Sequence, residues 1–113
     1  GCLTARAIRV PTLNVSAMDI SVYVESKIDF DSVNNVLREA SQNYLPNVLG
    51  VTEQPLVSCD FNHDPRSAIV DLTQTSVSKG HLLKVFVWFD NEWAYANRML
   101  DITQFLADMG AVK

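Results

Sequence analysis

The sequence feature that most constrains the fold is the run Leu82–Phe89, in which only Lys84 interrupts a series of apolar residues. A strand that is apolar on both alternating faces is typical of a sheet interior covered on both sides. The preceding segment 68–77 is rich in β-branched residues, and residues 78–80, Ser-Lys-Gly, suit a tight connection between two strands. The sequence therefore predicts a hairpin whose second strand is central in a sheet.

Other segments show one of two periods. From Ser16, Met18, Ile20, Val22 and Val24 alternate with polar residues, which predicts a half-buried strand. Apolar residues then recur at helical spacing from Phe30 to Tyr44, and Asp29 is placed to cap that helix, with Ile28 and Val33 as a hydrophobic staple. A second helix is expected from residues 90–92 to Gly110.

Two weaker strand predictions complete the order of elements. Residues 5–10 are a short strand candidate stopped by Pro11, and Val57, Cys59 and Phe61 alternate as in a strand. This order predicts an α+β domain, a mostly antiparallel sheet with two main helices packed on it. At 113 residues, the chain is expected to form one domain with one real core.

Composition and charge exclude several classes of function. Hydrophobic residues make up 48% and charged residues 19%, which is unlike a disordered chain or a membrane span. The formal charge of −4 is opposite to what a nucleic-acid binder needs, so we expect neither a nucleic-acid nor a membrane partner. Two cysteines make no disulfide framework and no secretory signal is visible, so a cytoplasmic location is expected.

The residue types that could carry chemistry by themselves do not converge on a site. Residues 59–64 contain metal-ligand types, but neighbouring strand residues point to opposite faces and zinc spacing is absent, so no metal is expected. Cys59 is interpreted as a core thiol and His63 as a loop residue that forms hydrogen bonds. Cys2 has no obvious activating partner, and no glycine-rich dinucleotide fingerprint is present.

Three residues leave a functional alternative open. Arg9 lies between apolar residues, where its guanidinium would need a structural ion-pair partner or would bind a phosphate or carboxylate; the local sequence alone favours the ion pair. Asn91 follows the apolar strand, and its amide complements another primary amide such as a nicotinamide carboxamide. A helix cap, which Asp90 or Asn91 could provide, is the simpler interpretation. Tyr95 is either a core residue or a surface on which a ring packs.

Two long motifs resemble a known family. Residues 9–16, Arg-Val-Pro-Thr-Leu-Asn-Val-Ser, resemble the Arg-Val-Pro-Thr-x-Asn-Val-Ser segment of phosphorylating glyceraldehyde-3-phosphate dehydrogenases. Residues 88–98, Trp-Phe-Asp-Asn-Glu-Trp-Ala-Tyr-Ala-Asn-Arg, resemble their Trp-Tyr-Asp-Asn-Glu-x-Gly-Tyr-Ser-Asn-Arg segment. Within that superfamily, residues 57–71 with the following Thr-Gln-Thr are similar to the branch that acts on erythrose 4-phosphate.

The resemblance implies a mechanism and roles for these three residues. In this family a cysteine attacks the aldehyde to form a hemithioacetal, hydride passes to NAD, and the resulting acyl-enzyme is cleaved. In the erythrose-4-phosphate branch water cleaves the acyl-enzyme. The product is then 4-phosphoerythronate, a precursor for pyridoxal phosphate synthesis. Arg9 stands where the family binds the substrate phosphate, and Asn91 where it orients the nicotinamide carboxamide. Tyr95 stands where an aromatic ring packs near the nicotinamide. The implied cofactor is NAD and the implied substrate a sugar phosphate.

The chain also departs from the family pattern. Ala94 stands where the family commonly has Gly, and its methyl group could shift Tyr95. The family's nucleotide-binding domain, its Ser-Cys-Thr-Thr-Asn nucleophile motif and its catalytic His are absent from these 113 residues, and Cys2 is not placed as that nucleophile. We therefore expect residues 1–113 to be the C-terminal part of the catalytic domain of a homotetrameric enzyme. As a fragment it should be inactive and should expose apolar area on its last helix.

Three functional readings remain open at this point. The first is a fragment of an enzyme that oxidises erythrose 4-phosphate, and the second is a fragment of a glyceraldehyde-3-phosphate dehydrogenase. The third is a non-catalytic α+β binding module. A strict requirement for inorganic phosphate in the assay of the full-length protein would favour the second reading over the first.

Overall fold

The chain folds around one four-stranded sheet in a computed structural model that describes residues 1–110. The strands are β1 (Ser16–Tyr23), β2 (Leu49–Thr52), β3 (Ala68–Ser78) and β4 (Leu82–Phe89), and their order in the sheet is β1-β4-β3-β2. β4 is antiparallel to both of its neighbours, whereas β2 is parallel to β3. The predicted α+β class and the central position of the strand at Leu82–Phe89 are confirmed.

The two faces of β4 are covered by different parts of the chain, as its apolar run predicts. Val87 is buried beside Val70 and Leu72, and Leu37 from the first helix packs against this cluster. Trp88, the next residue, packs on the opposite face against the buried Phe61, with ring centroids 5.3 Å apart. The strand is thus held between a helix and the segment around Phe61.

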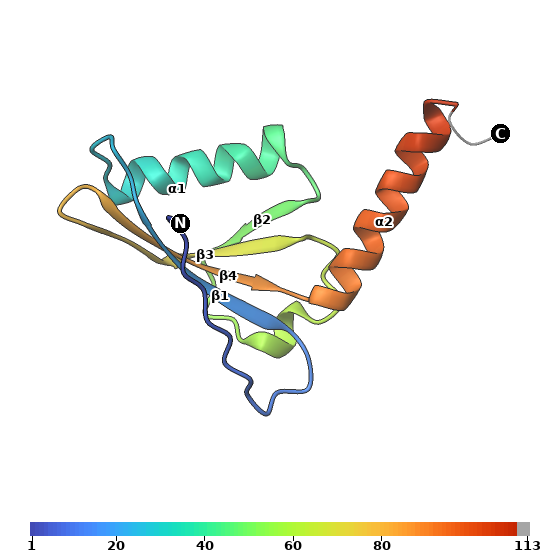
Figure 1. The fold of residues 1–113 in the computed structure, drawn as a ribbon, viewed down its shortest axis with the longest axis horizontal. Helices are drawn as coiled ribbons and strands as arrows, with labels where there is room; N and C mark the ends of the chain where they lie inside the picture. Colours follow the sequence, from blue (N-terminus) through green and yellow to red (C-terminus); the bar gives the residue numbers. More distant parts are fainter. Residues whose placement is uncertain (111–113) are drawn as a thin grey trace.

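The first helix is α1 (Phe30–Glu39), which continues into a π-helical segment, Ala40–Tyr44. Asp29 is its N-cap: the backbone N–H of Ser32 donates to Asp29 Oδ1 over 2.8 Å, and the Ser32 hydroxyl completes a capping box. The predicted cap is therefore confirmed. Figure 1 shows α1 lying across one face of the sheet.

The last helix, α2 (Asn91–Asp108), leaves the end of β4 and points away from the sheet (Figure 1). Only its beginning is packed, since Ala94 is buried while the apolar residues farther along are exposed. Of the two helices predicted to pack on the sheet, α1 does so, whereas α2 points away from it (Figure 1). The expected exposure of apolar area on the last helix is confirmed.

Two of the predicted strands do not form. Residues 5–10 have no regular secondary structure and are exposed, because no strand of the described range 1–110 lies beside them to pair with their backbone. Residues 58–61 form a 3₁₀ helix, which is closed when the N–H of Asp60 donates to the Val57 carbonyl. In this turn Phe61 is buried and Cys59 is exposed, so the prediction of a core thiol at Cys59 is wrong.

The connection between β3 and β4 is as tight as predicted. Lys79 and Gly80 both have positive φ, of 51° and 73°, and the N–H of His81 donates to the Ser78 carbonyl over 3.2 Å. Two successive positive φ values define the turn whose twist matches that of a β-hairpin. The strand β2 was not predicted, because four residues are too few to show a period.

Candidate functional site

The two sequence motifs meet in space at Asp90. Asn14, from the motif at residues 9–16, donates a side-chain hydrogen bond to Asp90 Oδ2 over 2.8 Å. Asp90 belongs to the second motif and immediately precedes α2. Segments 76 residues apart in the sequence are therefore joined by one direct bond.

Asp90 is held from several directions. Its Oδ1 accepts from the backbone N–H of Trp93 over 3.1 Å, which caps α2, and its Oδ2 accepts from the backbone N–H of His63 over 2.9 Å. The residue is only 1% exposed. Burial by itself raises the pKa of Asp90, but the two N–H groups and the Asn14 amide favour the ionised form and hold the pKa below its usual value. Asp90 is therefore a buried carboxylate, ionised at neutral pH.

The same amide of Asn14 has a second acceptor. Its Nδ2 atom also donates to Asn62 Oδ1 over 2.6 Å. We call the bonds that join Asn14, Asn62, His63, Asp90 and Trp93 the Asp90 network. Because an amide nitrogen has two hydrogens, both are used and the orientation of the Asn14 side chain is defined.

Strained backbone accompanies the Asp90 network. Val15 has φ 72° and His63 has φ 60°, and each follows directly on an asparagine of the network. A left-handed conformation is a genuine outlier for a β-branched residue and costs about 1–3 kcal/mol. Val15 is held there because its side chain is buried against Phe61 and Ile69. The burial of Val15 and the hydrogen bonds of Asn14 thus hold the backbone of these two residues in its strained conformation.

A small hollow lies beside the network. Its volume is about 150 Å³, and it is lined by Asn14, His63, Asp90, Glu92 and Trp93. The rings of His63 and Trp93 have centroids 4.6 Å apart at an angle of 32°. The prediction that His63 is a loop residue with a hydrogen bond is confirmed for its backbone N–H, while its ring packs against Trp93.

Asn91 and Tyr95 lie together on the first turns of α2. Asn91 is the first helical residue and is exposed, whereas the cap of the helix is Asp90. The expected cap at Asp90 or Asn91 is therefore confirmed for Asp90, and Asn91 is not the cap. Tyr95 is four residues farther on, so it shares a helix face with Asn91, and at 67% exposure it is not a core residue. Both side chains are available to a ligand.

Arg9 lies on a different segment from the other two predicted site residues. It is exposed and forms no ion pair with any residue of the described range 1–110, so the structural ion pair favoured by local sequence is not observed. Its connection to Asn91 runs through Asn14, five residues later, and Asp90. The structure thus brings Asn91 and Tyr95 onto one face, and the Asn14–Asp90 side-chain hydrogen bond joins the segment of Arg9 to the start of their helix.

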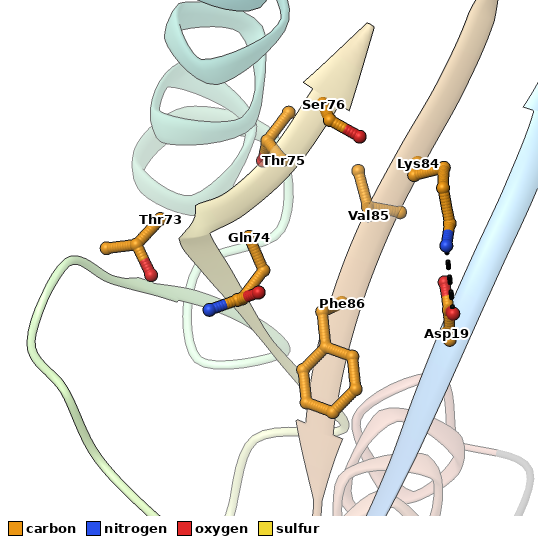
Figure 2. A pocket seen from close by; sticks show the side chains of 8 residues that line it. All are labelled: Asp19, Thr73, Gln74, Thr75, Ser76, Lys84, Val85 and Phe86. Carbon is orange, nitrogen blue, oxygen red and sulfur yellow. Dashed lines mark hydrogen bonds and ion pairs between the residues drawn. The ribbon is translucent and has the colours of Figure 1, made fainter.

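A larger hollow of about 360 Å³ lies elsewhere, over β1, β3 and β4 (Figure 2). It forms where the register of β3 against β4 shifts between Asp71 and Ser76. Lys84 Nζ lies 3.1 Å from Asp19 Oδ2, and this exposed pair spans β4 and β1 in Figure 2. The hollow contains none of the three predicted site residues, so we place the candidate site at the Asp90 network.

Three other features of the described residues bear on function. Within residues 1–110, no cluster of three or more His, Cys, Asp or Glu side chains could hold a metal ion. Neither helix of that range combines the length and the apolar character needed to cross a membrane. Cys2 and Cys59 are both exposed and free.

Sequence reasoning missed Asn14 as a member of the site and considered Asp90 only as a cap. Asn14 stands inside the first motif, but no local pattern shows that its partner lies 76 residues away. A signal was nonetheless present, because an Asp directly after an apolar central strand must either reach a donor or remain unpaired in a buried position.

These features define a class of domain. Its mixed sheet has a central strand that ends at a buried aspartate, Asp90, which caps the next helix and accepts a hydrogen bond from the motif that carries Arg9. An exposed amide, Asn91, follows this aspartate directly. A family model described as "Glyceraldehyde 3-phosphate dehydrogenase, C-terminal domain" matches residues 1–91. The chain belongs to that family, which is a family of oxidoreductases. The match extends over the whole sheet and ends at Asn91.

Proposed function

We propose that the protein containing this chain is an NAD-dependent dehydrogenase that oxidises D-erythrose 4-phosphate to 4-phosphoerythronate, a D-erythrose-4-phosphate dehydrogenase. The observation that carries this proposal is the junction of the two motifs at Asp90, which leaves Arg9 and Asn91 exposed beside their anchored segments. Residues 1–113 would be the C-terminal part of the catalytic domain. The product would serve pyridoxal phosphate synthesis in the cytoplasm, and the enzyme would be a homotetramer.

Arg9 would bind the phosphate of the substrate. A guanidinium presents two parallel N–H donors that match two phosphate oxygens. No described residue pairs with Arg9, so its donors are free for this purpose. Fixing the phosphate would fix the other end of a short sugar at the reacting centre.

Asn91 and Tyr95 fit a nicotinamide cofactor. The amide of Asn91 offers one acceptor and two donors, the complement of a carboxamide, and no described side chain occupies it. Tyr95 would present its exposed ring on the same helix face. NAD, when bound, would supply the acceptor for the hydride that leaves the substrate. The role of this chain would be to hold the carboxamide in one orientation while Arg9 holds the substrate.

The choice of substrate rests on residues 57–71, which are similar to the erythrose-4-phosphate branch. Glyceraldehyde 3-phosphate is the alternative substrate, and membership of the family supports it equally. The two functions differ in how the acyl-enzyme would be cleaved, by water in the first and by inorganic phosphate in the second. Activity of the full-length protein with each aldehyde, with and without phosphate, separates them.

The decisive test of the residue roles uses two arginines of the same exposed segment. In the full-length protein, Arg9→Ala should raise the KM for the sugar phosphate by about 10-fold or more, since a charged hydrogen-bonded contact is lost. Arg6→Ala is the matched control and should behave as the wild type. Equal kinetic constants for the two variants would contradict the role of Arg9.

A second pair tests the cofactor contact. Asn91→Ala should raise the KM for NAD and lower kcat, because the carboxamide would be bound less tightly and in more than one orientation. The control is Asn35→Ala, which changes an exposed asparagine on α1. Unchanged NAD kinetics in Asn91→Ala would refute the assignment.

A further inference from the structure

We propose that Asn14 is a positioning residue: through Asp90 it sets the spacing between the segment that carries Arg9 and the helix start that carries Asn91. This inference rests on the proposed function, since the spacing matters only if the two residues bind two reacting molecules. It assigns a function to a side chain other than the three predicted site residues Arg9, Asn91 and Tyr95.

Asn14 is the tether nearest to Arg9. Residues 1–10 have no regular structure and are exposed. Within residues 1–14, Asn14 makes the only side-chain hydrogen bonds to a distant part of the described chain. Between Arg9 and Asn14 the backbone is shortened by a turn, in which the N–H of Thr12 donates to the Val10 carbonyl over 2.9 Å. This five-residue segment with its turn therefore limits how far Arg9 can lie from Asn14.

The other end of this tether, at Asp90, is held rigidly. Asp90 is buried and accepts backbone N–H groups from His63 and Trp93 besides the Asn14 amide. Asn91 follows Asp90 directly and is the first residue of α2. Whatever fixes Asp90 therefore fixes the start of the helix that carries Asn91 and Tyr95.

The backbone next to Asn14, at Val15, is strained. A valine at φ 72° is strained, and a residue without a β-carbon would adopt this conformation at no cost. The strained turn orients Asn14 toward Asp90 while Val15 is buried on the opposite side against Phe61 and Ile69. Strained backbone that persists at a binding site, supported on both sides, points to a required geometry.

The consequence for catalysis is specific. Loss of the Asn14–Asp90 bond leaves Arg9 and Asn91 each able to bind its own ligand, so the two KM values should change little. The relative placement of the ligands should suffer, and a misplacement of about 1 Å costs up to roughly 100-fold in rate. The expected signature is a lower kcat with nearly constant KM values.

The experiment uses the full-length enzyme with NAD and the sugar phosphate. Asn14→Ala should lower kcat by about 10- to 100-fold, with each KM within about threefold of the wild type. Asn14→Asp should lower it further, because a second carboxylate would face Asp90. Asn35→Ala and Asn35→Asp are the matched controls on the exposed surface of α1 and should keep the wild-type kcat.

A third variant guards against misfolding. Asn62→Ala removes only the exposed acceptor of Asn14 and leaves Asp90 intact, so it should fold and lower kcat less than Asn14→Ala. Thermal unfolding is recorded for each variant, and kcat is measured well below each melting temperature. A purely structural role would lower the melting temperature while the folded enzyme kept its kcat.

The outcomes separate the two proposals. If the wild-type enzyme is active and the kcat values of Asn14→Ala and Asn62→Ala are both within twofold of the wild-type value, the positioning role is overturned and the proposed function stands. A wild-type enzyme that is inactive with both sugar phosphates overturns the proposed function, and the inference that rests on it. A fall in kcat confined to the Asn14 and Asn62 variants supports both.

Discussion

Replacement of Asp90 by alanine tests the central anchor of the structure. The carboxylate accepts three hydrogen bonds, from the Asn14 amide and from the backbone N–H groups of His63 and Trp93. Hydrogen bonds to a charged group are worth more than neutral ones, and donors left without a partner in a buried place cost a further desolvation penalty. The loss of the helix cap adds to these costs, so we expect Asp90→Ala to destabilise the fold by about 3–5 kcal/mol.

The matched comparison is Asp29→Ala. Asp29 also caps a helix, but it is exposed, and its partner Ser32 can be solvated by water after the change. The expected loss there is about 1 kcal/mol, as is usual for a surface cap. Urea denaturation followed by far-UV circular dichroism and tryptophan fluorescence measures both, and Asp90→Ala should lower the midpoint by at least about 1 M.

The pH dependence adds an independent check. Because the pKa of Asp90 is lowered in the folded protein, its stabilising contribution is fully present above the unfolded-state pKa of about 4 and is lost as the pH falls through the folded-state value. The stability difference between wild type and Asp90→Ala should thus be constant near neutrality and shrink in acid. If Asp90→Ala costs no more than Asp29→Ala at pH 7, the reasoning about the buried network is wrong.

Three further predictions concern other parts of the fold. Leu72→Ala, at a side chain that is fully buried under α1, should lower the free energy of unfolding by about 3 kcal/mol in urea denaturation, and an effect under about 1 kcal/mol would contradict its place in the core. The Arg66 guanidinium holds the pKa of the Asp64 carboxyl below its usual value. In Gly50→Ala the new methyl group would collide with that guanidinium, so the pKa of Asp64 should rise in an NMR titration. An unchanged pKa would show that Arg66 keeps its ion pair with Asp64. The exposed apolar residues of α2 should make the 113-residue chain self-associate, and Phe105→Glu should reduce the association seen by sedimentation; equal sedimentation of both would exclude the helix as the cause.

The period of the side chains was sufficient for most of the fold. The two-residue period from Ser16 and the apolar run at Leu82–Phe89 predicted β1 and β4, and Asp29 marked the start of the first helix. The strand predicted at residues 5–10 and the alternation at 57–61 were wrong. Alternation is necessary for a strand but does not supply a neighbour, and local hydrogen bonds closed a tight turn at Asp60 instead.

For the site, the sequence by itself determined which side chains are present and in which motifs they stand. It identified Arg9, Asn91 and Tyr95 by resemblance, and those roles remain predictions. Only the tertiary structure decided that Asp90, and not Asn91, caps α2 and that Asn14 is its partner. The physical reason is that a hydrogen bond between residues 76 positions apart depends on how the sheet brings two segments together, and no local pattern encodes that distance.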